Sequence, residues 1–131
     1  MNVESLREFC LTLPQVTEKV RWGDNLLFCI GGRMFAITSF DPAARVRISF
    51  KCSPDGYYEL LEKEGIIPAP YLARAQWVSL ERWDALSDRE LEGWVAHAYE
   101  LIKAKLPRKT REALAKKKNG RKAKKAQHRR R

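Results

Sequence analysis

Histidine and cysteine are scarce in this sequence. Its 131 residues include two His and three Cys. The cysteines, Cys10, Cys29 and Cys52, form no C-x-x-C pair, and an odd number cannot all pair with one another. This argues against a secreted disulfide scaffold and indicates a reducing compartment. The spacing of His, Cys and Asp matches no metal-site motif either, so neither a metal nor a cofactor is expected.

Several other signatures are missing. No stretch approaches the roughly 18 apolar residues of a membrane span, and no signal-peptide pattern opens the chain. There is no G-x-S-x-G nucleophile elbow and no phosphate-binding loop. His97 is the one candidate base outside the C-terminal segment, and no partner for it is evident. We therefore expect a cytoplasmic monomer that is not an enzyme, contacts no membrane and has no small-molecule substrate.

Positive charge is abundant but lies at one end. The chain carries a net charge of +10, and its pI is about 9.8. Residues 108–131 hold thirteen Lys and Arg against one acid, Glu112, a net charge of +12, so residues 1–107 carry −2. All aromatic residues lie in residues 1–107, and the segment after Leu114 has almost no large apolar side chain. The sequence thus predicts a folded domain over 1–107 and, over 108–131, a basic tail that is disordered or transiently helical.

Local patterns predict the elements of the folded part. Apolar spacing indicates a helix that begins near Val3 and ends before Pro14. QVTEKVRWGD, LLFCI, RMFAITSF and RVRISFK are typical of strands in an antiparallel meander. Ser53-Pro54 begins a second helix, QWVSL is a last strand, and Ser87-Asp88-Arg89-Glu90 is a capping box that begins the final helix. This order predicts an α+β fold, a two-layer sandwich with helices packed on one face of an antiparallel sheet.

Two predicted turns and one predicted strand place polar or basic residues where they can contact a ligand. Gly31-Gly32 tolerates the positive φ of a type I′ or II′ hairpin, and Asp41-Pro42-Ala43-Ala44 forms a longer connection. Alternation in RVRISFK puts the apolar residues on one face and a basic set on the other, namely Arg45, Arg47, Ser49 and Lys51.

Aromatic side chains offer a second kind of contact, base stacking, beside core packing. Core packing is the interpretation favoured for most of them: Trp22, Phe28, Phe35, Trp77 and Trp94. Trp83 lies in a loop-like context and is the best candidate for an exposed aromatic residue.

Five segments of the chain resemble the MmcQ/YjbR family in order and approximate spacing: REFCLTLPQVTEKVRWGD, GGRMFAI, ISFKCSP, PYLARAQWVSL and AYELIKAKLPRK. The resemblance covers nearly all of residues 3–111. It implies a CyaY-like (frataxin-like) fold and a DNA-binding role, attributed to two β-hairpins likened to a double wing. Carried over by position, the wings fall on Gly31-Gly32-Arg33 and on residues 41–45. The basic tail extends beyond the family pattern.

The candidate nucleic-acid-binding residues are therefore cations of the wings and of the tail. Those of the wings and the adjoining strand face are Arg33, Arg45, Arg47 and Lys51. Those of the tail are Lys116, Lys117, Lys118, Arg121, Lys122, Lys124, Lys125, Arg129, Arg130 and Arg131. The alternative for the wing residues is an ordinary solvated sheet face. Tail cations gain free energy by releasing counterions from a polyanion, which requires no base recognition.

The expected function is non-enzymatic binding of nucleic acid, with DNA ranked ahead of RNA. The tail should supply most of the affinity, and the wings contribute. The alternative is a protein-interaction or scaffold domain whose polycationic tail binds nucleic acid only non-specifically.

Overall fold

The computed structural model describes residues 1–116, and its elements follow the predicted order with two additions. The helices and strands are α1 (Val3–Thr12), β1 (Thr17–Arg21), β2 (Asn25–Ile30), β3 (Arg33–Ser39), β4 (Ile48–Lys51), α2 (Pro54–Leu61), β5 (Ile66–Pro68), β6 (Trp77–Leu80) and α3 (Asp88–Ala104). Short 3₁₀ turns at Ala73–Ala75 and Trp83–Ala85 flank β6. One addition is β5, which lies in the Pro-rich connection where no strand was predicted. The other is a helical segment over residues 108–116.

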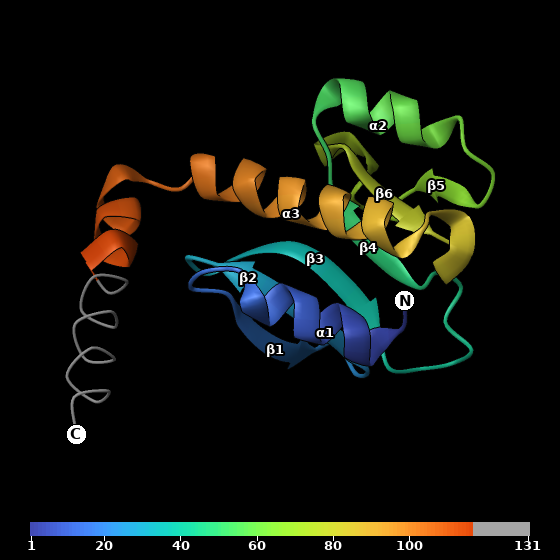
Figure 1. Cartoon of the computed structure of the whole chain (residues 1–131), viewed down its shortest axis with the longest axis horizontal. Coiled ribbons are helices and arrows are strands. Elements are labelled where there is room, and N and C mark those ends of the chain that lie inside the picture. Colours follow the sequence, from blue (N-terminus) through green and yellow to red (C-terminus); the bar gives the residue numbers. More distant parts are fainter. Residues whose placement is uncertain (117–131) are drawn as a thin grey trace.

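The six strands form one antiparallel sheet in the order β1-β2-β3-β4-β6-β5. Helices α1, α2 and α3 cover one face of this sheet, and we call the other face the open face (Figure 1). The predicted α+β two-layer architecture is confirmed. Proline ends β5 at the edge of the sheet, where a missing N–H disrupts no inner ladder.

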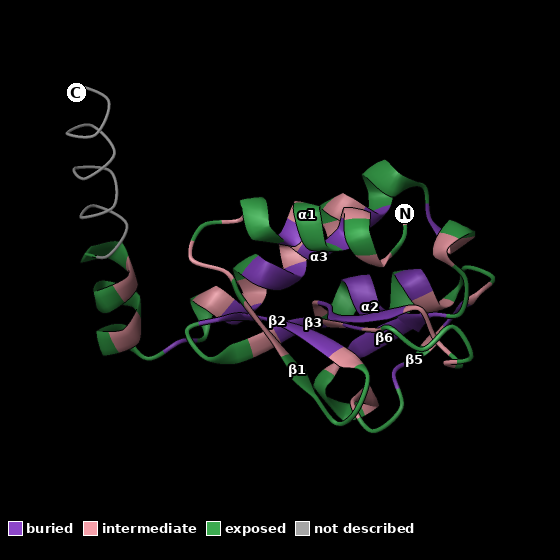
Figure 2. Ribbon diagram, turned by 90° about the horizontal axis from the view of Figure 1, so that it is seen from below, coloured by how far each residue is buried: buried purple, intermediate pink, exposed green. Residues whose placement is uncertain are grey.

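The core lies between the sheet and the three helices, where buried ribbon segments face each other (Figure 2). Phe28, Phe35 and Phe50 are fully buried and lie centrally in the sheet. The ring of Phe35 meets Tyr99 of α3 edge to face, with centroids 5.6 Å apart. Tyr99 also donates its hydroxyl hydrogen to the carbonyl oxygen of Pro14 over 2.7 Å, which ties α3 to the end of α1.

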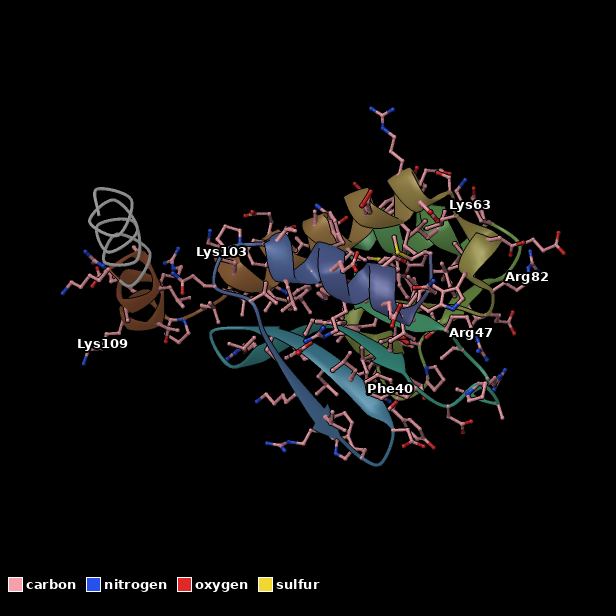
Figure 3. The ribbon with its side chains drawn as sticks, turned by 60° about the horizontal axis from the view of Figure 1, so that its bottom comes forward. Phe40, Arg47, Lys63, Arg82, Lys103 and Lys109 are labelled. Atoms are coloured by element: carbon pink, nitrogen blue, oxygen red, sulfur yellow. The ribbon has the colours of Figure 1, made fainter. Side chains whose placement is uncertain are left out.

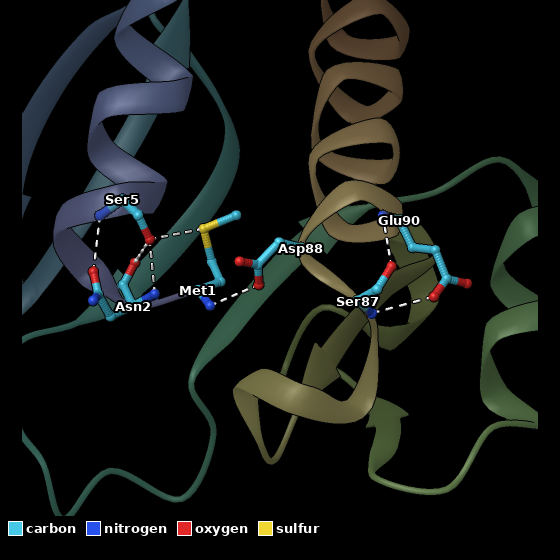
Figure 4. Close-up of polar contacts among 6 residues, drawn as sticks. All are labelled: Met1, Asn2, Ser5, Ser87, Asp88 and Glu90. Atoms are coloured by element: carbon cyan, nitrogen blue, oxygen red, sulfur yellow. Dashed lines mark hydrogen bonds and ion pairs between the residues drawn. The ribbon is translucent and has the colours of Figure 1, made fainter.

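Capping residues fix the helix starts, as the sequence predicts for α2 and α3. Ser87 Oγ accepts from the Glu90 N–H, and Glu90 accepts in return from the Ser87 N–H, each over 3.2 Å (Figure 4). These hydrogen bonds hold the pKa of Glu90 below its usual value. The N-terminal ammonium group of Met1 lies 2.7 Å from Asp88 Oδ1, so the starts of α1 and α3 are joined by an ion pair.

The β2–β3 turn also follows the prediction. Gly31 and Gly32 have φ of 59° and 80°, the left-handed values that a two-residue type I′ turn requires at both positions. Gly31 lies against the segment after α3, since a Cβ there would fall 2.6 Å from Leu106 Cδ1 and 3.1 Å from Thr110 Cγ2.

The predicted basic face of the fourth strand is wrong. Strand β4 spans Ile48–Lys51, and all four of its residues are buried. Residues 69–76 fold across the open face there, so the strand is covered on both sides. Ser49 consequently pairs with Ser79 across β4 and β6, with the two hydroxyl oxygens 2.6 Å apart. Alternation described the register correctly, but it could not show that the second face is also covered.

The helical segment 108–116 continues the chain after Pro107, whose carbonyl accepts from the Arg111 N–H. Leu114 packs against the core, and Gln15 Nε2 donates to the Leu114 carbonyl over 3.3 Å. The start of the predicted tail therefore contacts the folded domain through Leu114. Among the described residues, no helix is long and apolar enough to cross a membrane.

Candidate nucleic-acid interface

The first predicted wing is positioned beside the C-terminal segment. Arg33 follows the Gly31-Gly32 turn and is exposed. Because Gly31 contacts Leu106 and Thr110, this turn lies next to the junction between α3 and the helical segment 108–116. Arg33 thus belongs to the end of the molecule from which the basic segment emerges.

Cations cluster at this end, which we call the basic end. It comprises Arg33 and the exposed cations after α3, namely Lys105, Arg108, Lys109, Arg111 and Lys116. Lys103 is half-buried, with Nζ 5.6 Å from the centre of the Tyr99 ring. One acid of the helical segment, Glu112, pairs with Arg108 at 3.0 Å. Among residues 1–116, the other cations of the basic end form no ion pair.

The second predicted wing is the loop over residues 40–47, and the structure uses one of its arginines internally. The guanidinium group of Arg47 donates to the carbonyl oxygen of Ala44 and, over 3.3 Å, to that of Pro42. Its own carbonyl accepts from Thr38 Oγ1 over 2.7 Å. Arg47 therefore stabilises the loop and its placement on an exposed basic strand face was wrong. Arg45 is exposed and remains a candidate.

Lys51 was also placed wrongly. It is 7% exposed, and its ammonium group donates to the Ala75 carbonyl. Burial lowers the pKa of Lys51, and the nearby charge of Lys105 lowers it further. A lysine held in this way is not positioned for phosphate contact.

The two wings do not come together. Arg33 starts β3, and Arg45 follows its far end. Seven residues of strand at about 3.3 Å each separate them by roughly 20 Å. In Figure 3, Lys103 and Lys109 lie toward the basic end, and Phe40 and Arg47 lie toward the opposite end of the sheet. Of the predicted tail residues, Lys116 is described and exposed. The others lie outside the described residues: Lys117, Lys118, Arg121, Lys122, Lys124, Lys125, Arg129, Arg130 and Arg131.

The open face of the sheet carries a groove that was not predicted from the sequence. This open-face groove has a volume of about 420 Å³ and lies between residues 44–48 and 70–72, with its floor on β2, β3 and β4. Met34 and Ile37 contribute apolar floor, and Trp22 and Tyr71 stand at its sides. Trp22 is 70% exposed, so its predicted core position is wrong, and Tyr71 is fully exposed. The signal available in the sequence was that both aromatics lie in turns, beside Gly23 and Pro70.

The predictions for the other aromatic residues are confirmed in part. Phe28, Phe35 and Trp77 are buried as predicted, and Trp94 is half-buried against the core. Trp83, predicted as the exposed aromatic, is also half-buried against the core. The ring of His97 lies 6.1 Å from that of Trp94 in a cleft between α2 and α3. Within residues 1–116, no three His, Cys, Asp or Glu side chains are grouped to hold a metal ion.

Comparison with known proteins gives a family and a fold. The YjbR family model matches residues 11–101. Protein DR2400 of Deinococcus radiodurans, described as a DUF419 domain, is 26% identical with a TM-score of 0.76, over 87% of this chain and 88% of that one. A protein from Pseudomonas syringae is 18% identical with a TM-score of 0.65, over 77% of this chain and 98% of that one, and supports the fold. No curated protein matches. Since the family model covers more than half of the sequence, the chain belongs to the YjbR family.

Proposed function

We propose that the protein is a non-enzymatic nucleic-acid-binding protein that contacts phosphates through its basic end and the cations that follow it. The observation that carries this proposal is the clustering of exposed cations around the Gly31–Leu106 contact. These cations come from two separate parts of the chain, the β2–β3 turn and residues 105–116. Residues 108–131 carry +12, so the charge continues from the folded surface into the tail.

Counterion release supplies the affinity. Each phosphate contact releases condensed cations from the nucleic acid, which makes binding fall with salt concentration at a slope of about −0.9 per contact on duplex DNA. The body of the protein, with its net charge of −2 over residues 1–107, contributes no attraction of this kind as a whole. The geometry therefore favours an end-on contact by the basic end over a contact by the whole sheet.

The three cysteines favour a role without cysteine-based catalysis. Burial raises the pKa of the Cys10 and Cys52 thiols to about 12, and it also raises the pKa of Cys29. A thiol attacks as its thiolate, so these three side chains are poor nucleophiles at neutral pH.

The test is a salt titration of binding to labelled duplex DNA, single-stranded DNA and RNA, measured by fluorescence anisotropy on the full chain. A variant with Arg33→Gln and Lys109→Gln should flatten the log–log salt slope on the duplex by up to about two units. The matched control, Lys63→Gln with Arg89→Gln, removes the same charge from exposed positions outside the basic end. Equal effects of the two pairs would show that only net charge matters. Absence of salt-sensitive binding by the full chain would contradict the proposal and favour the protein-interaction alternative.

A further inference from the structure

Two aromatic residues of the open-face groove hold backbone conformations that bulky side chains rarely adopt. Trp22 has φ of 51°, and Tyr71 has φ of 67°. Leu72 N–H donates to the Ala69 carbonyl over 3.1 Å, so Tyr71 takes the position after Pro70 where a type II turn favours glycine. Asn25 Nδ2 donates to the Trp22 carbonyl over 3.1 Å and holds the β1–β2 turn. Non-glycine residues at positive φ cluster at functional sites, where the strain is retained for the side chain.

Burial of these two rings does not compensate for the backbone strain. Trp22 is 70% exposed and Tyr71 104% exposed, so neither ring contributes much to the core. Phe40 is 50% exposed, and its N–H donates to the Asp24 carbonyl in the same β1–β2 turn over 2.8 Å. Trp22 and Tyr71 thus line one largely apolar groove, and exposed apolar surface of this kind marks binding sites.

Cations lie on the same open face as the groove. Lys19 lies in one cross-strand row with Leu27, Ile37 and Ser49, and Arg21 lies in the next row with Asn25 and Ser39. Residues directly opposite one another point to the same face, so both cations project from the open face on which the groove lies. Their charges act on the Cys29 thiol of that same face, lowering a pKa that burial raises. Exposed Arg45 lines the groove itself.

We propose that the open-face groove binds single-stranded nucleic acid, with bases stacked on Trp22 and Tyr71 and phosphates on Lys19, Arg21 and Arg45. Aromatic platforms beside a cationic track are the means by which proteins bind unpaired strands without sequence preference. The proposal rests on the proposed function and adds a second contact surface to it. This surface is specific for unpaired strands, because a base within a duplex does not present its face.

The form of the groove favours a strand over a free nucleotide. Exposed Arg45 lines the groove from the 40–47 loop, and exposed Arg21 on β1 pairs in register with Asn25, which also lines it. Arg47, the other cation of the lining, is taken up by the carbonyls of its own loop. Cations on β1 and on the 40–47 loop of this face match a phosphate backbone that passes across the groove, whereas a site for a free nucleotide buries most of the ligand's surface.

Glycine variants separate stacking from folding. Trp22→Gly and Tyr71→Gly remove the rings and place glycine where the backbone already has positive φ, so the melting temperature should stay the same or rise. The double variant should bind a labelled twelve-residue oligothymidine at least roughly ten-fold more weakly, because each stacked base contributes on that scale or more. Affinity for a twelve-base-pair duplex should be unchanged. Tyr58→Ala, which removes a ring 66% exposed on α2, is the control and should alter neither affinity.

A second variant tests the cations. Arg21→Gln with Arg45→Gln should flatten the salt slope for oligothymidine by about one unit or more, at roughly 0.7 per contact on a single strand. Thymidine monophosphate at the same nucleotide concentration should compete poorly, and strong competition would reassign the groove to free nucleotides and overturn the proposal.

The outcomes distinguish the two proposals. Wild-type affinity of the glycine double variant for oligothymidine, together with a loss in the Arg33→Gln, Lys109→Gln variant, would overturn the groove and leave the basic end. Loss in the glycine variant with no effect of Arg33→Gln, Lys109→Gln on either ligand would support the groove and overturn the basic end. Failure of the wild-type chain to bind any nucleic acid would overturn both.

Discussion

Gly31 and Leu106 are in direct contact although seventy-five positions separate them in the chain, and a Cβ on Gly31 would lie 2.6 Å from Leu106 Cδ1. This contact brings the β2–β3 turn against the segment after α3. It places Arg33 beside the start of the basic segment, a juxtaposition on which the proposed nucleic-acid contact depends.

Gly31→Ala should therefore destabilise the protein more than Gly32→Ala. Both glycines have positive φ, which costs a non-glycine residue about 1–2 kcal/mol. A Cβ on Gly32 meets nothing within 4 Å, whereas one on Gly31 overlaps Leu106. The difference between the two free energies of unfolding should be about 1 kcal/mol or more in urea denaturation. Adding Leu106→Ala should reduce that difference, and equal losses in the two single variants would contradict the contact.

Leu114→Ala should lower the free energy of unfolding by about 1 kcal/mol. Leu114 is half-buried and packs against the core, and alanine favours a helix at least as well, so a loss reports packing rather than helix propensity. Hydrogen exchange of residues 108–116 should accelerate at the same time. Lys116→Ala, at an exposed position of the same segment, is the control. Unchanged stability in Leu114→Ala would mean that this segment does not pack on the core in solution.

The Ser49–Ser79 pair should behave as a coupled unit. The hydroxyl oxygens lie 2.6 Å apart and both residues are buried, so Ser49→Ala leaves Ser79 without this partner. Each single alanine variant should cost about 1–3 kcal/mol, and the double variant should cost clearly less than the sum. A double-mutant cycle from chemical denaturation measures the coupling. Strict additivity would show that the hydroxyl groups do not interact.

The free energy of unfolding should rise with pH in the alkaline range because of Lys51. Its pKa is lowered in the folded state by burial and by Lys105, while the unfolded chain has the ordinary value of 10.5. Between these two values the unfolded state binds more protons, so the free energy of unfolding rises with pH up to about 10.5. Lys51→Met should flatten that rise relative to the wild type. Lys105→Met removes the nearby like charge and should reduce the rise only in part. If the rise is unchanged in Lys51→Met, another titrating group causes it.

Sequence patterns predicted the elements well where the determining interactions are local. Ser87 and Glu90 cap α3 through hydrogen bonds within three residues, and the Gly31-Gly32 turn follows from the φ that glycine permits. The candidate site was predicted less well. Arg33 and Arg45 are exposed as expected, but Lys51 is buried. Trp22 was predicted in the core and instead lines an exposed groove.

The sequence by itself determined the helix starts, the meander of β1 to β4 and the concentration of positive charge after residue 107. Each of these depends on neighbouring residues or on composition. Only the tertiary structure decided which side chains face solvent on the second face of the sheet. Residues 69–76 cover β4 and bury Lys51, yet leave Ile37 and Met34 as the floor of a groove. The reason is physical: strand alternation states which residues share a face, but the covering of that face depends on a segment distant in the chain.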